Sequence, residues 1–167
     1  MASNSKKLFL LDTPAFISLE SIGLMEKVIL YFKVITTNSV VNELEGFSKH
    51  SDELGNIARR VLKFKGIYLI EDRKIKEQIM YIEQTDNELF NLAKEKRIPL
   101  VSDDHKIIHH TKDKIEVYFS TFFLMAFATA GIIVREDAIK MLEKLRDIRN
   151  WRNNIIYLTT KEGLENL

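Results

Sequence analysis

Short apolar segments alternate with longer amphipathic segments along most of this chain, and this alternation constrains its fold more than any other feature. The apolar segments are rich in leucine, valine and isoleucine and have the length of buried strands. Strands that alternate with helices pair in parallel, because each helix returns the chain to the starting edge of the sheet. We therefore predict a three-layer α/β/α fold with a central, mainly parallel sheet of four to five strands.

The boundaries of these elements follow from the same pattern. We expect strands at residues 8–12, 34–37, 67–71, 100–103 and 115–118. We expect helices at residues 16–31 (broken near Gly23), 52–65, 74–84, 121–130 and 135–148, and further helices that begin near residues 39 and 86.

The length and composition favour a single folded domain over 1–167. The 167 residues can bury a sizeable core, and the two prolines and six glycines form no linker. We expect a core over 8–119 that holds an acidic site, and a helical extension over 120–150. For the tail, 151–167, the pattern predicts no definite element.

The absence of cysteine and the nearly neutral net charge of +1 exclude several function classes. Disulfides, thiolate zinc sites and a cysteine nucleophile are ruled out, and the lack of cysteine is typical of a cytoplasmic protein. The longest apolar stretch, 118–134, is shorter than a membrane span and includes Ser120, Thr121 and Thr129. We interpret it as a helix buried in the core or in a dimer interface, and we expect no membrane association.

Carboxylates follow two of the predicted strands and lie near the start of two predicted helices. Asp12 follows the first strand, Asp103 and Asp104 follow the fourth, and Glu43 and Asp86 belong to early turns of helices. Strand ends and the starts of the following helices share one edge of a parallel sheet, where ligands bind. Carboxylates gathered there repel one another unless a cation is bound. Oxygen ligands suit Mg²⁺ or Mn²⁺, which can activate a water to hydrolyse a phosphodiester.

Taken singly, some of these acids have simpler explanations. Acidic residues are common at helix starts because they suit the helix dipole. Asp86 lies within a capping-box pattern, with Thr85 as the expected N-cap and Glu88 three residues later. Glu43 is close to Glu45 and taken alone is typical of a solvated position. The hypothesis of a metal site therefore depends on the whole set rather than on any member.

The ordered set resembles the motifs of the PIN-domain nucleases. The resemblance spans residues 8 to about 118, and each motif is short, so its specificity lies in the order and spacing. Pro14 stands where a small polar residue is more usual, and Ser102 stands where threonine is common. The motifs are Asp12-Thr13, Val40-Val41-Asn42-Glu43, Thr85-Asp86-Asn87-Glu88-Leu89 and Ser102-Asp103-Asp104.

The resemblance implies an endoribonuclease that cleaves single-stranded RNA with Mg²⁺ or Mn²⁺. Many members are toxins paired with an antitoxin protein, and homodimers are frequent. Because Asp103 and Asp104 alternate in direction along an extended chain, we expect only one of them to contact metal. The implied metal-binding and catalytic residues are Asp12, Glu43, Asp86 and either Asp103 or Asp104, with the hydroxyls of Thr13 and Ser102 in support.

Basic residues near these motifs are candidates for contact with an RNA backbone. Arg59, Arg60 and Lys63 lie in the predicted helix 52–65, although such a run is more often a solvated face. His105 and Lys106 directly follow the acidic doublet and are better placed for a phosphate.

Two other function classes compete with the nuclease. One is a catalytically weak PIN-like module that binds RNA or protein as an assembly or regulatory factor, which the near-zero net charge favours. The full set of acids argues against it, because a pure binder gains nothing from carboxylates that face phosphate. The other is a phosphatase with an aspartyl nucleophile, but that class has Asp-x-Asp after its first strand, and this chain has Asp12-Thr13-Pro14.

Overall fold

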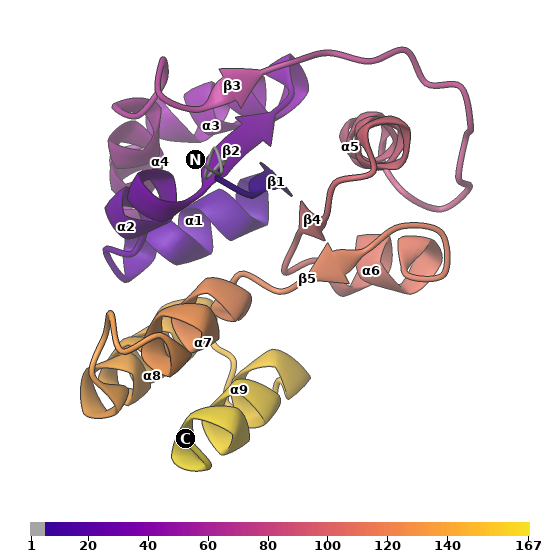
Figure 1. The fold of residues 1–167 in the computed structure, drawn as a ribbon. Coiled ribbons are helices and arrows are strands. Elements are labelled where there is room, and N and C mark those ends of the chain that lie inside the picture. The colour runs from indigo at the N-terminus through magenta and orange to yellow at the C-terminus, as the bar shows by residue number, and fades with distance from the viewer. Residues whose placement is uncertain (1–5) are drawn as a thin grey trace, which may run out of the picture.

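The computed structural model describes residues 6–167 and has a parallel five-stranded sheet at its centre (Figure 1). The strand order is β3-β2-β1-β4-β5, and every neighbouring pair runs parallel. This confirms the predicted fold class, and the first five residues of the predicted domain lie outside the described part. The strands are β1 (Leu8–Leu11), β2 (Lys33–Thr36), β3 (Leu69–Ile70), β4 (Leu100–Val101) and β5 (Val117–Tyr118).

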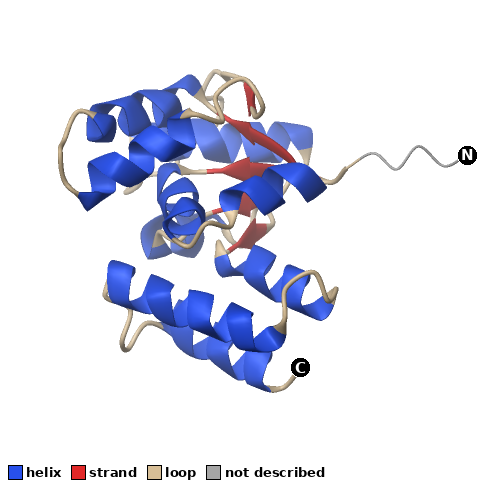
Figure 2. Ribbon diagram, turned by 90° about the vertical axis from the view of Figure 1, so that its left-hand side faces the viewer, coloured by secondary structure: helices blue, strands red, loops and turns tan. Residues whose placement is uncertain are grey.

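Nine helices in the described part of the chain surround this sheet (Figures 1 and 2). Helices α1 to α4 gather on one side, whereas α5 and α6 lie on the other, as right-handed connections between parallel strands require. The helices are α1 (Thr13–Ser21), α2 (Met25–Tyr31), α3 (Asn38–Ser48), α4 (Glu53–Leu62), α5 (Gln84–Lys96), α6 (His105–Thr111), α7 (Thr121–Thr129), α8 (Arg135–Arg149) and α9 (Ile155–Glu165).

The strand order creates a crevice between β1 and β4. The chain moves outward from β1 through β2 to β3, then returns to the other side of β1 for β4 and β5. The connections that leave β1 and β4 therefore diverge to opposite faces at the carboxyl ends of these strands. In open α/β sheets such a switch point is where ligands bind. Asp12 follows β1 directly, and Asp103-Asp104 follow β4 after Ser102.

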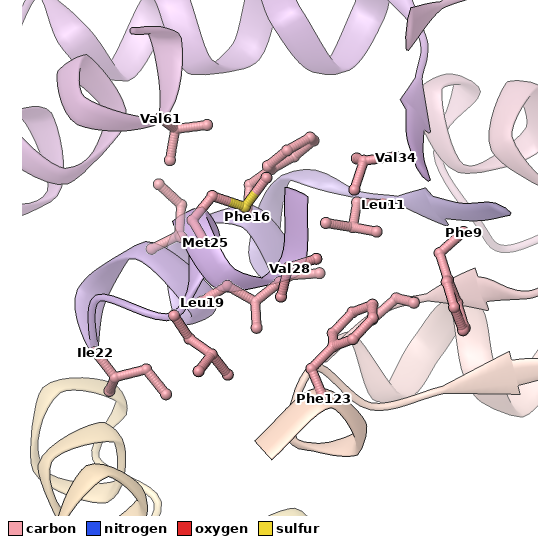
Figure 3. Packing of buried hydrophobic residues seen from close by; sticks show 14 of the residues in the cluster. Phe9, Leu11, Phe16, Leu19, Ile22, Met25, Val28, Val34, Val61 and Phe123 are labelled. Carbon is pink, nitrogen blue, oxygen red and sulfur yellow. The ribbon is translucent and has the colours of Figure 1, made fainter. Parts of the chain in front are cut away.

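The core packs β1 against α1, α2 and α7 (Figure 3). Phe9 is fully buried on β1, and its ring centroid lies 5.2 Å from that of Phe32 and 5.1 Å from that of Phe123 on α7. Met25 and Val28 of α2 are also fully buried in this cluster. Aromatic pairs at this spacing add to the free energy of burial. The first strand, and Asp12 after it, are therefore held rigidly.

The apolar stretch that contains α7 is buried within the chain itself. Phe123, Leu124 and Phe127 pack into the core, and the opposite side of α7 contacts α9. The Thr160 hydroxyl of α9 donates a hydrogen bond of 2.8 Å to the Thr121 hydroxyl of α7. Helix α9 occupies most of the tail for which the sequence predicted no element. No helix among residues 6–167 combines the length and apolar character needed to cross a membrane.

Several predicted local features are wrong. The helix predicted over 74–84 does not form: residues 74–83 follow an irregular path whose backbone is bound by buried asparagines of α5, and Gln84 begins α5. The helix expected to begin near residue 39 begins at Asn38, and Thr37 caps it by accepting a hydrogen bond from the Val40 N–H. The capping box of α5 pairs Glu83 with Asp86 instead of Thr85 with Glu88. Asp86 is therefore the third residue of its helix.

Candidate metal centre

Five carboxylates from four separate segments line one cavity of about 240 Å³. It lies at the carboxyl ends of the strands, beside the switch point between β1 and β4. Its other lining residues include the apolar side chains of Pro14, Ile17, Phe47 and Leu54. One of the five is Glu83, the N-cap of α5. The four acids that belong to the predicted motifs are Asp12 after β1, Glu43 of α3, Asp86 of α5 and Asp104 after β4.

Asp12 lies deepest in this site and is only 2% exposed. It is the N-cap of α1, where its Oδ1 accepts a 2.7 Å hydrogen bond from the Ala15 N–H. Burial raises the pKa of Asp12 well above its ordinary value, and the nearby carboxylates of Asp103 and Asp86 raise it further, although Ser102 and Ala15 act in the opposite direction. The protein holds this carboxylate where negative charge is costly, so a cation would bind there favourably.

Glu43 enters the cavity from the second turn of α3 and is held in place by α1. The Thr13 hydroxyl, directly after Asp12, donates a hydrogen bond to the Glu43 Oε2. Thr13 itself is buried. The sequence predicted that Thr13 would support the acidic site, and the structure shows it bridging two of the four acid-bearing segments.

Asp86 faces the other acids from the first turn of α5. Partial burial raises its pKa to about 6, and the carboxylates of Asp104, Glu83 and Glu43 raise it as well. Its Oδ2 accepts a long hydrogen bond of 3.4 Å from the Glu83 N–H. Asp86 in turn contributes to the raised pKa of Asp12, so its negative charge is unfavourable to both carboxylates.

The structure separates the two members of the Asp103-Asp104 doublet. Asp103 is buried and accepts hydrogen bonds from the Ser120 N–H (2.8 Å) and hydroxyl (2.7 Å), so it holds the start of α7. Asp104 lines the cavity and caps α6 by accepting a 2.7 Å bond from the Lys106 N–H. The buried Ser102 hydroxyl accepts a bond from the Asp104 N–H and so fixes the turn. Asp103 is absent from the cavity lining.

The donor set suits a hard divalent cation. Every candidate ligand atom is a carboxylate oxygen, and among residues 6–167 none of the four acids takes part in a salt bridge. Within the same residues, no three His, Cys, Asp or Glu side chains are close enough together to hold a metal as they stand. The chemistry of the site therefore fits Mg²⁺ or Mn²⁺, and ligation requires the side chains to move closer together.

One basic residue lines the acidic cavity, and it is not among the basic residues predicted from the sequence to contact RNA. Arg149 is the last residue of α8, and its guanidinium lies 5.6 Å from the centroid of the Trp151 ring. It also lowers the pKa of Asp103 through its charge. Arg149 lies 45 residues after Asp104 in sequence. The motifs of the acids therefore give no indication that Arg149 reaches the cavity.

The basic residues predicted to contact RNA fall into two groups. Arg59 donates to the carbonyls of Ser48 and His50, and Arg60 forms a 2.8 Å ion pair with Glu20. Both therefore stabilise packing around α4 rather than remaining free for a phosphate. The remaining three candidates, Lys63, His105 and Lys106, are exposed, and the last two begin α6 beside Asp104.

Comparisons with known proteins add similarity of fold only. No protein-family model and no curated protein sequence matches the chain. The chain is similar to a domain of a functionally unknown protein from Methanocaldococcus jannaschii DSM 2661, with 25% identity, a TM-score of 0.49 and coverage of 68% of this chain and 90% of that one. It is also similar to a PilT N-terminus domain protein from the hyperthermophilic archaeon Sulfolobus solfataricus P2, with 14% identity, a TM-score of 0.45 and coverage of 71% and 92%. The function therefore rests on this chain's own residues.

Proposed function

We propose that this protein is a metal-dependent phosphodiesterase, and specifically an endoribonuclease that cleaves single-stranded RNA. The observation that carries the proposal is the convergence of four carboxylates, with raised pKa values at two of them, on one cavity at the switch point of a parallel sheet. The resemblance of the four motifs to those of PIN-domain nucleases supports RNA as the substrate class.

In this proposal Asp12, Glu43, Asp86 and Asp104 bind the metal. A bound Mg²⁺ or Mn²⁺ supplies an activated water and neutralises charge on the phosphoryl oxygens. The chain's own residues hold the acids in place: Thr13 orients Glu43, and Ser102 fixes the turn that carries Asp104. Asp103 has a structural role at the start of α7, and it is not part of the proposed ligand set.

Arg149 contacts the substrate phosphate in this proposal. It is the basic side chain that lines the acidic cavity, and a guanidinium suits the paired oxygens of a phosphate. Its contact with the Trp151 ring limits how far the side chain can move. Arg149 thus offsets negative charge brought by the RNA at a site already crowded with carboxylates.

The test is cleavage of a mixed-sequence, end-labelled single-stranded RNA by the purified protein. We expect cleavage with Mn²⁺ or Mg²⁺, loss of cleavage with EDTA, and loss of cleavage in Asp12→Asn with the metal present. Asp113→Asn is the matched control, because Asp113 is exposed and lies outside the cavity lining. Cleavage that survives in Asp12→Asn would contradict the proposal.

A second candidate function is binding of RNA without cleavage. The observation that favours it is the spacing of the acids, since no three of them in the described residues are close enough together to hold a metal without movement. RNA binding by the wild-type protein with no cleavage in either metal would establish this alternative. A calorimetric titration with Mn²⁺ separates the two functions further, because only the nuclease requires the metal to bind.

A further inference from the structure

The segment between β3 and α5, residues 71–83, presents two exposed apolar side chains. Met80 is 68% exposed and Tyr81 is 73% exposed. The segment contains no helix or strand. An irregular connection of this length in a compact domain usually has a functional role. Side chains of this kind on such a segment are candidates for binding.

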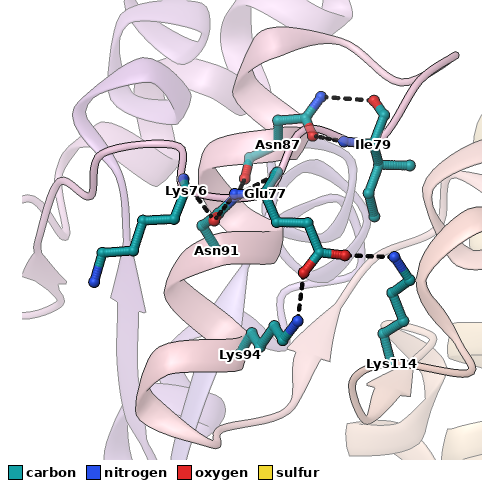
Figure 4. Close-up of polar contacts among 7 residues, drawn as sticks. All are labelled: Lys76, Glu77, Ile79, Asn87, Asn91, Lys94 and Lys114. Carbon is teal, nitrogen blue, oxygen red and sulfur yellow. Dashed lines mark hydrogen bonds and ion pairs between the residues drawn. The ribbon is translucent and has the colours of Figure 1, made fainter.

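Buried amide side chains of α5 hold the segment in one conformation (Figure 4). Asn87 accepts a 2.7 Å hydrogen bond from the Ile79 N–H and donates to the Ile79 carbonyl at 3.1 Å. Asn91 accepts bonds from the N–H groups of Lys76 and Glu77 and donates to the Glu77 carbonyl. The two asparagines replace the backbone pairing that a helix or strand would provide. Tyr81 is therefore carried on a fixed support.

Apolar packing and ion pairs reinforce this support. Ile79 and Ile82, on either side of the exposed residues, pack against Phe90 of α5. The Glu77 carboxylate forms ion pairs with both Lys94 and Lys114 (Figure 4). The segment is thus attached on each side of Met80 and Tyr81, which are its exposed large apolar side chains.

Tyr81 adopts an unusual backbone conformation that directs its ring. Its φ is +74°, a left-handed value that is rare and costly for a bulky residue other than glycine. The ring stacks against His110 of α6, with centroids 5.9 Å apart and an angle of 28° between the planes. His109 meets His110 edge to face at 5.0 Å. The strained residue therefore places an exposed flat ring next to another aromatic ring.

Two short stretches of the chain connect this ring pair to residues that line the acidic cavity. Glu83, which lines the cavity, is two residues after Tyr81, and an extended chain spans at most about 7 Å over that separation. Asp104 caps α6, and His110 lies six residues later, a rise of about 9 Å along the helix. Lys106 is four residues before His110, on the same helical face. A short oligonucleotide could reach from the rings to the acids.

We propose that Tyr81 and His110 form a stacking site for a base of a single-stranded nucleic acid whose backbone enters the acidic cavity. Unpaired bases stack on exposed aromatic rings, and nearby basic side chains attract the phosphates. Lys106, exposed in the first turn of α6 after Asp104, supplies such a charge. The apolar patch at Met80 and Tyr81 is too small for a stable protein interface, which favours a base over a protein. The proposal deepens the proposed function, because it gives the substrate a fixed entry to the same site.

The test measures binding of a labelled single-stranded RNA by fluorescence anisotropy in EDTA, where the proposed cleavage does not proceed. We expect Tyr81→Ala to weaken binding by a factor of about 5 to 100, the range seen when a ring that stacks a base is removed. Tyr81→Phe keeps the ring and is expected to keep most of the affinity. Met80→Ala is the matched control from the same exposed segment and is expected to bind as the wild type does.

A stability measurement separates a stacking role from a structural one. Tyr81→Gly removes the ring and also relieves the left-handed strain, so we expect it to raise the melting temperature while it weakens RNA binding. A purely structural Tyr81 would move both quantities in the same direction. RNAs with one abasic position provide a further check, because the Tyr81→Ala effect should vanish when the missing base is the one that stacks.

The outcomes distinguish failure of this inference from failure of the proposed function. Unchanged RNA affinity in Tyr81→Ala, or no RNA binding by the wild type, would overturn the stacking site. Cleavage by the wild type would still support the nuclease in the first case. Conversely, RNA binding that depends on Tyr81, without cleavage in Mg²⁺ or Mn²⁺, would support the stacking site and overturn the nuclease.

Discussion

The Thr13 hydroxyl donates a hydrogen bond to the Glu43 carboxylate and so ties the start of α1 to the second turn of α3. These residues are 30 positions apart in sequence, and Thr13 directly follows Asp12. One hydrogen bond therefore links two of the five acids that line the cavity, Asp12 and Glu43.

Replacing Thr13 with valine tests this link. Valine keeps the shape of threonine but cannot donate, so we expect Glu43 to lose its orientation and RNA cleavage to fall about 10- to 100-fold, as for other residues that support a metal ligand. Thr13→Ser, which keeps the hydroxyl, should retain most of the activity. Equal activity in the valine and serine variants would contradict this role.

The roles of Asp103 and Asp104 are separable by substitution. Substitution of a residue that supports a metal ligand typically costs about 10- to 100-fold in activity. Asp104 is a proposed ligand, so we expect Asp104→Asn to reduce cleavage by more than this, with little change in stability. Asp103→Leu leaves the buried donors of Ser120 without an acceptor and should lower the free energy of unfolding by about 2 kcal/mol. Urea unfolding together with RNA cleavage checks both variants. A stable Asp103→Leu protein would contradict the assignment.

The raised pKa of Asp86 predicts a pH-dependent effect on stability. Its carboxyl has a pKa of about 6 in the folded chain against 3.8 ordinarily, so its ionisation opposes folding above about pH 4. Without metal at pH 7, we expect Asp86→Asn to raise the free energy of unfolding by about 1 kcal/mol, after allowance for partial exposure. The gain should shrink as the pH falls through 6 and vanish below about pH 4. Urea titrations in EDTA across this range measure it, and a gain independent of pH would show another cause.

Arg149 is expected to act on the substrate phosphate. Arg149→Gln removes the charge, and we expect kcat/KM for RNA cleavage to fall about 10- to 1000-fold, comparable with the loss of a group that stabilises a developing anion. Arg149→Lys should restore part of the activity, because it keeps the charge but loses the paired donors. Calorimetric titration with Mn²⁺ is the control, since metal affinity should not fall in either variant. A fall in metal affinity that matched the loss of activity would point to an effect on the acids instead.

The buried side chain of Asn87 is expected to be essential for the conformation of 76–83. Asn87→Leu leaves the Ile79 N–H and several carbonyls unpaired, and we expect a loss of about 3 kcal/mol in the free energy of unfolding. Asn42→Leu is the matched control, because Asn42 is exposed in α3 and should change stability by less than about 0.5 kcal/mol. Hydrogen exchange of the Ile79 amide reports the local effect. An unchanged exchange rate in Asn87→Leu would show that the apolar packing is sufficient to hold the segment.

The sequence alone determined the parallel α/β fold and the edge of the sheet where the acids lie. Both follow from local patterns, since apolar strands alternate with helices, Asp12 comes directly after a strand and Asp104 comes within three residues of the end of another. The strand order placed Asp12 and Asp104 beside the crevice, as that topology requires. The predicted helix over 74–84 was wrong, although the apolar residues there have helical spacing. Asn87 and Asn91 bind the backbone of this segment in another conformation, and these hydrogen bonds form only in the folded chain.

Only the tertiary structure decided which residues face the cavity. Alternation along the chain showed that Asp103 and Asp104 diverge, but the contact of Asp103 with Ser120 identified the structural member. Arg149 lines the cavity from the end of α8, and Tyr81 stacks on His110 from a different segment, and the motifs of the acids indicate neither contact. Such contacts depend on packing between distant segments, and local periodicity contains no information about that packing.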